Sequence, residues 1–178
     1  MLALNRAKEI NCTVDEFWMG LAHDIGKLDT GNSESHIGHE KNIGLVDEFC
    51  RGMKLTAEQV FLCVTFARNH MRLLRFNEMR PYKIAQMLDE FRATHTLAIT
   101  ISMAVCAGAD ALGRAKETFV PFTLYDVEMA LEAFRKVTGN DIVQACVAAG
   151  KPMPKGKKFG QRLNEMRGMA IKKALGRQ

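Results

Sequence analysis

The sequence predicts an all-α protein, and three observations support that prediction. Apolar residues recur every three or four positions along nearly the whole chain, which is the period of an amphipathic helix. Thr13, Thr56 and Thr123 each precede such a segment, where a threonine hydroxyl can cap a helix N-terminus. Hydrophobic residues make up 47% of the 178 residues, which is enough to bury the core of one domain with an appendage.

The first helix is expected after Thr13, because Asp15 and Glu16 then fall in the first turn, where the helix dipole favours acids. Its apolar stripe consists of Val14, Phe17, Trp18, Leu21, Ala22 and Ile25. Gly26 predicts the end of this helix, and the polar residues 28–35 predict a loop.

A second helix is expected to begin at His36, with His39 on the same face because the two positions are three residues apart. Its apolar positions are Ile43, Val46, Phe49 and Met53. The third helix follows Thr56, and His70 lies on it.

The second half of the chain predicts five more helical segments. Pro81 suits the first turn of a helix over residues 82–91, and the almost wholly apolar residues 94–112 predict a central buried helix. A helix after Thr123 should end near residue 139, and a short one should cover residues 141–149. Residues 151–156 contain two prolines and predict a break before a basic helix over residues 161–175. We therefore divide the chain into a domain over residues 1–150 and a basic tail over residues 151–178.

The positive charge of the chain is concentrated in this tail. Residues 151–178 contain nine Lys or Arg and one acid, a net charge of +8, so the remaining residues carry −3 of the total of +5. A basic segment on a nearly neutral body favours a polyanionic partner such as RNA, although a solvated terminus has the same composition. Neither DNA nor a membrane is expected as a partner.

The cysteine pattern and the hydropathy predict a cytoplasmic location. The five cysteines are scattered, without the CxxC spacing of a zinc finger, which favours reduced thiols in a cytoplasmic protein. No run approaches the ~20 apolar residues of a membrane span. The N-terminus also lacks the plan of a signal peptide.

A candidate metal site is centred on His23 and Asp24, at the end of the first predicted helix. Imidazole and carboxylate groups are the usual ligands of hydrolytic divalent-metal sites. Asp110 lies in a strongly apolar run, where an ionised carboxylate is costly unless it is paired or bound to a metal. Two alternatives stay open for Asp110: a metal ligand, or a partner of Arg114 at the helix surface.

Other residues are candidates for binding phosphate near this site. Lys27 is placed to hold a phosphate oxygen or simply to solubilise the helix end. His36, His39 and His70 can contact a substrate phosphate or a second metal, or form ordinary helix-surface hydrogen bonds.

The order of these motifs carries a family resemblance. LAHDIGK, a polar loop, HIGHE, a helix with His70 and then AGADALGR resemble the HD-superfamily phosphohydrolases. The pattern is most similar to the HD domain in the C-terminal half of bacterial CCA-adding tRNA nucleotidyltransferases. It matches well over about residues 4–114 and more weakly in the tail.

The resemblance implies an all-helical HD bundle that hydrolyses 2′,3′-cyclic phosphates, 2′-nucleotides and simple phosphate esters. It implies that His23, Asp24 and Asp110 bind the metal, and that Asp24, Lys27, His39 and His70 are catalytic. Lys27, His36 and Arg114 would bind phosphate. Ni²⁺, Co²⁺, Mn²⁺ and Mg²⁺ are the expected ions, and Zn²⁺ is less favoured because no cysteine joins the site.

Two departures from the family pattern shape the expectation for this chain. No histidine precedes His23, although the family motif begins with one on the preceding helix. No Gly-Gly loop with paired catalytic aspartates precedes the HD segment, so we expect a C-terminal fragment that does not add CCA by itself. Such a fragment is expected to show weak hydrolysis that needs excess metal, and exposed apolar surface that promotes self-association.

The hypothesis is thus a metal-dependent phosphohydrolase acting on tRNA ends or small phosphate esters. The alternative is a non-catalytic, tRNA-binding C-terminal fragment of a CCA-adding enzyme. A third hypothesis is that the chain is a folded remnant without activity of its own.

Overall fold

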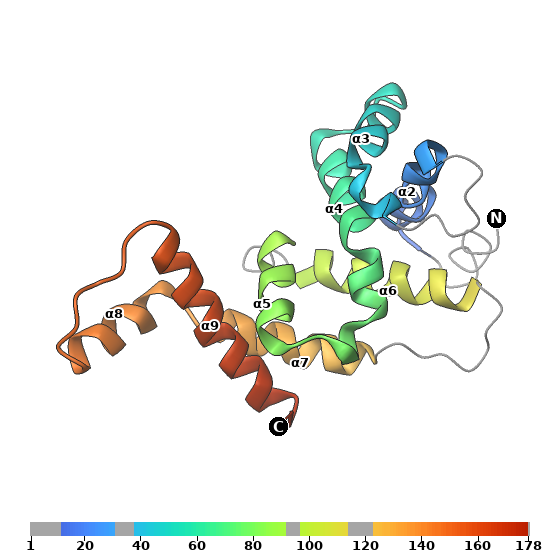
Figure 1. Cartoon of the computed structure of the whole chain (residues 1–178). Coiled ribbons are helices and arrows are strands. Elements are labelled where there is room, and N and C mark those ends of the chain that lie inside the picture. The colour runs from blue at the N-terminus through green and yellow to red at the C-terminus, as the bar shows by residue number, and fades with distance from the viewer. Residues whose placement is uncertain (1–11, 31–37, 92–96, 114–122, 178) are drawn as a thin grey trace. The chain divides into compact units, whose positions relative to one another are not determined.

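A computed structural model describes residues 12–30, 38–91, 97–113 and 123–177. These residues form eight α-helices, α2 to α9, with three short 3₁₀ helices and no strand, which confirms the all-α prediction (Figure 1). They fall into two compact units. The first contains residues up to 77 together with residues 101–113, and the second contains residues 78–100 together with residues 123–177.

The first unit is built around α4, Ala57–Leu74, on which α2, Val14–Ala22, and α3, Ile43–Gly52, both pack. Both threonine caps predicted in this unit are formed. The Thr13 and Thr56 hydroxyls accept from the backbone amides of Glu16 and Gln59, respectively. The Glu16 and Gln59 side chains in turn accept from the backbone amides of the two threonines. The unit encloses buried apolar side chains, among them Met19, Ala22, Val46, Cys50, Leu62, Cys63 and Phe66. Part of the predicted first stripe stays at the surface, since Val14 and Phe17 are exposed.

Two predicted boundaries in this unit are wrong. The helix α2 ends at Ala22, and the chain continues as a 3₁₀ helix, Ile25–Thr30, which covers the start of the expected loop. The helix α3 begins at Ile43 and not near residue 36, because a separate 3₁₀ helix, His39–Lys41, precedes it. His36 itself lies outside the described residues.

The helix α6, Leu97–Gly113, is the predicted apolar helix. In the first unit its residues Met103, Ala104 and Ala107 are buried, so its apolar composition reflects packing. This placement brings Asp110, near its end, into the interior, with only 6% of the residue exposed.

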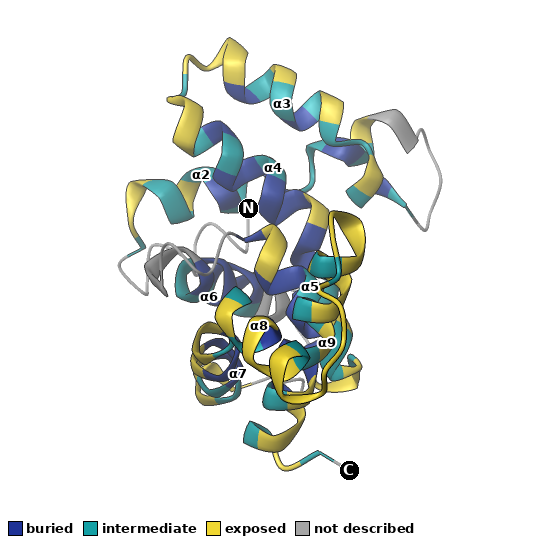
Figure 2. Ribbon diagram, turned by 90° about the vertical axis from the view of Figure 1, so that its left-hand side faces the viewer, coloured by how far each residue is buried: buried dark blue, intermediate teal, exposed yellow. Residues whose placement is uncertain are grey.

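The second unit contains α5, Pro81–Glu90, α7, Leu124–Lys136, α8, Gly139–Ala148, and α9, Lys157–Ala174. Helix α9 packs on both α5 and α7. A Cβ on Gly168 would lie 3.0 Å from Tyr82 Cα, so the glycine allows α9 to approach α5 closely. Figure 2 shows that α8 is mostly exposed, in contrast to the buried inner sides of α5 and α7.

One basic residue of α9 belongs to the interior of this unit. The Arg167 guanidinium is buried, donates to Asp89 Oδ1 at 3.0 Å and to the Val137 carbonyl at 3.3 Å, and lies 4.0 Å from the centre of the Phe134 ring. This arginine therefore contributes to packing and is not available to an external polyanion. No helix in the described part of the chain is long and apolar enough to cross a membrane.

Candidate metal centre

The end of α2 orients His23 toward the interior of the first unit. His23 is the C-cap residue of α2, and its Nδ1 lies 2.8 Å from the Gly20 carbonyl oxygen, one turn back along the helix. An Nδ1–H that donates to this carbonyl leaves Nε2 as the functional ring nitrogen. The imidazole packs against the buried ring of Phe66, with 5.8 Å between ring centres.

Two carboxylates face this nitrogen. His23 Nε2 lies 3.3 Å from Asp24 Oδ2 and 3.5 Å from Asp110 Oδ1. Asp24 comes from the turn after α2, and Asp110 comes from α6. The neighbouring residues His23 and Asp24 reach the same point because α2 ends at Ala22, with His23 as its C-cap, and the chain turns there before the 3₁₀ helix that begins at Ile25.

A second pair of histidines completes the cluster. His39 Nε2 lies 3.1 Å from Asp24 Oδ1 and 3.2 Å from His70 Nε2. His70 is fully buried on α4, and its Nδ1 lies 2.7 Å from the Ala67 carbonyl oxygen. Because Nδ1 of His70 donates there, its Nε2 is an acceptor, and the proton between the two rings is assigned to His39 Nε2.

Burial and the neighbouring charges shift the pKa values of three residues in this cluster. Burial lowers the pKa of His23, but Asp110 and Asp24 outweigh it and raise that pKa to about 9. Burial raises the pKa of Asp24, whereas His23 and Lys27 hold that pKa far below its usual range. Burial and the positive charge of His23 lower the pKa of His70 to about 4. At neutral pH the metal-free cluster therefore contains a cationic His23 and a neutral His70.

The donor set fits a divalent cation. His23 Nε2 and Asp24 Oδ1 are buried, and the groups of opposite charge beside them form no hydrogen bond of good geometry with them among the described residues, so both atoms can turn to an ion. His23, Asp24 and His70 each offer a ligand atom within 4.8 Å of the others. Mixed nitrogen and oxygen donors suit first-row divalent ions.

A glycine brings the two halves of the cluster together. A Cβ on Gly26 would lie 2.3 Å from the His39 carbonyl oxygen, so no side chain fits at this position. The side-chain amide of Asn42 donates through Nδ2 to the Gly26 carbonyl oxygen at 3.3 Å and joins the same two segments. We predicted Gly26 as a helix stop; its structural role is this close backbone contact.

The structure brings together five of the predicted site residues, namely His23, Asp24, His39, His70 and Asp110. Lys27 lies beside them, with its Nζ 2.5 Å from Asp24 Oδ2. His36 and Arg114 lie outside the described residues, so their predicted phosphate contacts and the alternative pairing of Arg114 with Asp110 stay predictions.

From the sequence, His70 was predicted to contact phosphate or a second metal and was not grouped with His23 and Asp24 as a ligand of the same ion, although it is one of the three clustered donors. His70 follows Asp24 by 46 residues and comes from a different helix, so no local spacing links the two. Besides its place in the HD-like order of motifs, the signal in the sequence was a histidine on the apolar face of α4, four residues after the buried Phe66.

Comparison with known proteins gives one consistent group of relatives. The multifunctional CCA protein of Teredinibacter turnerae is 29% identical over 180 residues, covering 97% of this chain and 41% of the relative. That of Aromatoleum aromaticum is 28% identical over 161 residues, covering 87% and 37%. That of Nitrosomonas europaea is 34% identical over 92 residues, covering 50% and 22%.

No family model matches the chain, and no solved structure matches it. The chain spans less than half the length of the relatives reported above. Over most of its own length, this chain is similar to the multifunctional CCA proteins.

Proposed function

We propose that the first unit is a metal-dependent phosphohydrolase that acts on 2′,3′-cyclic phosphates, 2′-nucleotides or simple phosphate esters. The observation that carries the proposal is the convergence of buried imidazole and carboxylate groups: ligand atoms of His23, Asp24 and His70 lie within 4.8 Å of one another. The HD-superfamily resemblance of the motifs supports the same chemistry. Similarity to multifunctional CCA proteins supports a role on tRNA ends.

In this proposal His23, Asp24 and Asp110 hold the ion, and His70 Nε2 joins them as a fourth donor when it exchanges its hydrogen bond from His39 for the ion. When bound, a divalent cation such as Ni²⁺, Co²⁺, Mn²⁺ or Mg²⁺ neutralises phosphate charge and lowers the pKa of water. Binding displaces the proton that the two carboxylates hold on His23.

The remaining residues act on the substrate directly. His39 carries a proton on Nε2, at the edge of the cluster, and is the candidate donor to the leaving oxygen. Lys27 supplies positive charge beside Asp24 and is the candidate contact to a phosphate oxygen. His36 and Arg114 remain candidates for phosphate binding from the sequence alone.

The test is hydrolysis of 2′,3′-cyclic AMP by the purified chain with each of the four ions, compared with EDTA. Asp24→Ala should abolish metal-dependent turnover. The matched control is Asp47→Ala, which removes an exposed carboxylate paired with Arg51 on α3. A well-folded sample that turns over no ester with any ion would contradict the proposal.

A second candidate function is tRNA binding without catalysis, favoured by the net charge of +8 in residues 151–178. Phosphate contacts release counterions, so tRNA affinity should fall steeply as salt rises from 50 to 200 mM, by roughly 10³-fold or more for six contacts. Electrophoretic mobility shift at several salt concentrations measures this slope. Binding that is absent, or independent of salt, would rule this candidate out.

A further inference from the structure

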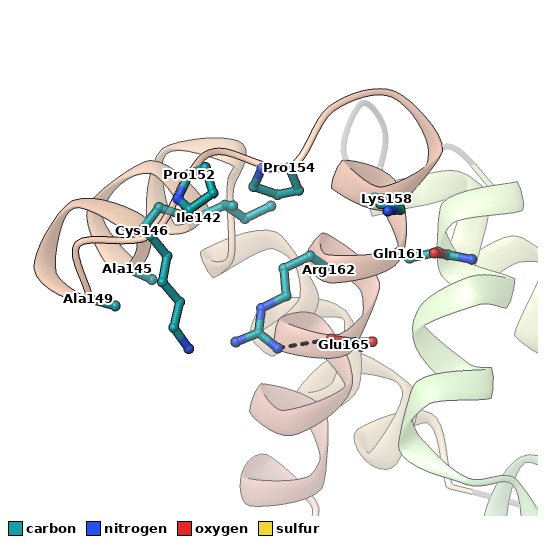
Figure 3. A pocket seen from close by; sticks show the side chains of 11 residues that line it. Ile142, Ala145, Cys146, Ala149, Pro152, Pro154, Lys158, Gln161, Arg162 and Glu165 are labelled. Atoms are coloured by element: carbon teal, nitrogen blue, oxygen red, sulfur yellow. Dashed lines mark hydrogen bonds and ion pairs between the residues drawn. The ribbon is translucent and has the colours of Figure 1, made fainter.

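A cleft lies within the second unit, between α8 and α9; it shares no residue with the candidate metal centre, and its basic residues belong to the segment 151–178 proposed above for tRNA binding. The segment that joins the two helices, with Pro152 and Pro154, closes one side of it (Figure 3). Its volume is about 450 Å³, within the ~300–1,000 Å³ usual for small-molecule sites.

The cleft is held in shape by contacts that do not depend on a ligand. Ile142 of α8 is 1% exposed, although most of that helix faces solvent. A Cβ on Gly139 would lie 3.2 Å from Phe159 Cζ, so the start of α8 rests directly on an aromatic ring of α9. The two prolines restrict the backbone of the joining segment. A cleft fixed in this way loses little conformational entropy when a ligand binds.

One wall of the cleft is apolar. It is formed by Ile142, Ala145, Cys146, Ala149, Pro152 and Pro154. An apolar surface of this kind favours an apolar or planar group, whose burial releases water.

Cationic side chains also line the cleft. Lys151 and Lys158 line the cleft, and neither side chain makes a hydrogen bond or an ion pair within the described part of the chain. In Figure 3 the Arg162 side chain extends from α9 toward α8, and Glu165 Oε2 accepts from its Nη1 at 2.9 Å. This contact orients the guanidinium and leaves its other N–H groups for a ligand. Three cations against one carboxylate give the cleft a positive charge.

From this combination we infer that the α8–α9 cleft binds a nucleotide, with its phosphate held by the cations that line the cleft, Lys151, Lys158 and Arg162, and its base on the apolar wall. Arginine and lysine donors match phosphate oxygens, and a nucleobase is the planar group that accompanies phosphate in a ligand of this size. Glu165 remains as an acceptor for sugar hydroxyls. The ligand is either a free mononucleotide or one nucleotide unit of an RNA strand.

Binding is measured by isothermal titration calorimetry with adenosine 5′-monophosphate, and separately with a 5′-phosphorylated single-stranded oligoribonucleotide. EDTA is present throughout, so failure of the proposed metal centre does not affect the result. Replacing two cleft lysines, Lys151→Gln with Lys158→Gln, should weaken binding at least about tenfold, since each removes a charge-assisted hydrogen bond. Binding of the mononucleotide identifies the free ligand, and binding of the oligonucleotide alone identifies RNA; both outcomes support the cleft.

The chain offers a matched control for net charge. Lys155 and Lys157 are exposed neighbours of the cleft lysines in sequence but do not line the cleft. The double variant Lys155→Gln with Lys157→Gln removes the same charge and should bind as tightly as the unaltered chain. An equal loss in both double variants would show diffuse electrostatic attraction and overturn the inference, as would failure of both ligands to bind.

A second readout locates the ligand. Cys146 lines the cleft and is half-buried, so a thiol reagent should modify it slowly. Bound nucleotide should slow the modification of the Cys146 peptide further, as followed by mass spectrometry. Binding that leaves this rate unchanged places the ligand elsewhere and overturns the inference.

Discussion

Gly26 and His39 are in direct backbone contact: a single Cβ on Gly26 would lie 2.3 Å from the His39 carbonyl oxygen. Through this contact the 3₁₀ helix that follows His23 and Asp24, Ile25–Thr30, meets the 3₁₀ helix that carries His39. The separation of His39 Nε2 from Asp24 Oδ1, 3.1 Å, depends on it.

Gly26→Ala is therefore expected to separate His39 from Asp24. Overpacking of this kind costs about 1–3 kcal/mol of stability, measured by urea denaturation. Metal affinity should also fall, by about 10–100-fold, because a group next to the ligands is displaced. The matched control is Gly44→Ala on α3, where a Cβ meets no atom within 4 Å, and which should be neutral or slightly stabilising. Equal behaviour of the two variants would show that the close contact has no role in the site.

Asp110→Asn is expected to weaken binding of a divalent ion at least about tenfold, since it replaces an anionic ligand by a neutral one. The side chain keeps its size, so the fold should survive, as circular dichroism can check. Calorimetric titration with Ni²⁺ or Mn²⁺ gives the affinity. Asp47→Asn, at the surface of α3, serves as the control and should bind the ion normally. Unchanged affinity in Asp110→Asn would remove this residue from the ligand set.

The metal-free protein should lose stability as the pH rises from about 6.5 to about 9. The pKa of His23 is raised to about 9 in the folded state, from a usual value of 6.5. A raised pKa means that the proton stabilises the folded state fully below pH 6.5, and that this contribution is lost as the pH passes through 9. A change of this size corresponds to roughly 3 kcal/mol.

Urea denaturation in EDTA at several pH values measures this loss. His23→Gln cannot be protonated and should show a flatter profile over the same range. A slope that is the same in both proteins would exclude His23 as its source.

Arg167→Ala is expected to destabilise the second unit by about 1–3 kcal/mol, because it removes a buried side chain packed on Phe134 and leaves the Val137 carbonyl without its donor. Arg135→Ala removes an exposed arginine of α7 and should change stability by less than about 0.5 kcal/mol. Thermal denaturation compares the two. A loss of tRNA or nucleotide binding in Arg167→Ala without loss of stability would instead place this arginine at a binding surface.

The sequence by itself determined the helical class, the threonine caps and the identity of the clustered residues. Capping depends on neighbouring residues, as when the Thr123 hydroxyl accepts from the amide of Asp126, three positions on. The His23–Asp24 pair and the isolated Asp110 were also visible, because metal-binding side chains stand out in apolar surroundings.

Only the tertiary structure decided how these residues meet. His70 joins His23 and Asp24 because α4 packs against α2, and Gly26 acts through contact with a residue 13 positions later. The helix period cannot predict such distances, since they depend on how separate helices pack. Arg167 is a second example. In the sequence it is one of the basic residues of the tail, but in the structure it is buried over the Phe134 ring. Its charge is tolerated there because it is paired with Asp89.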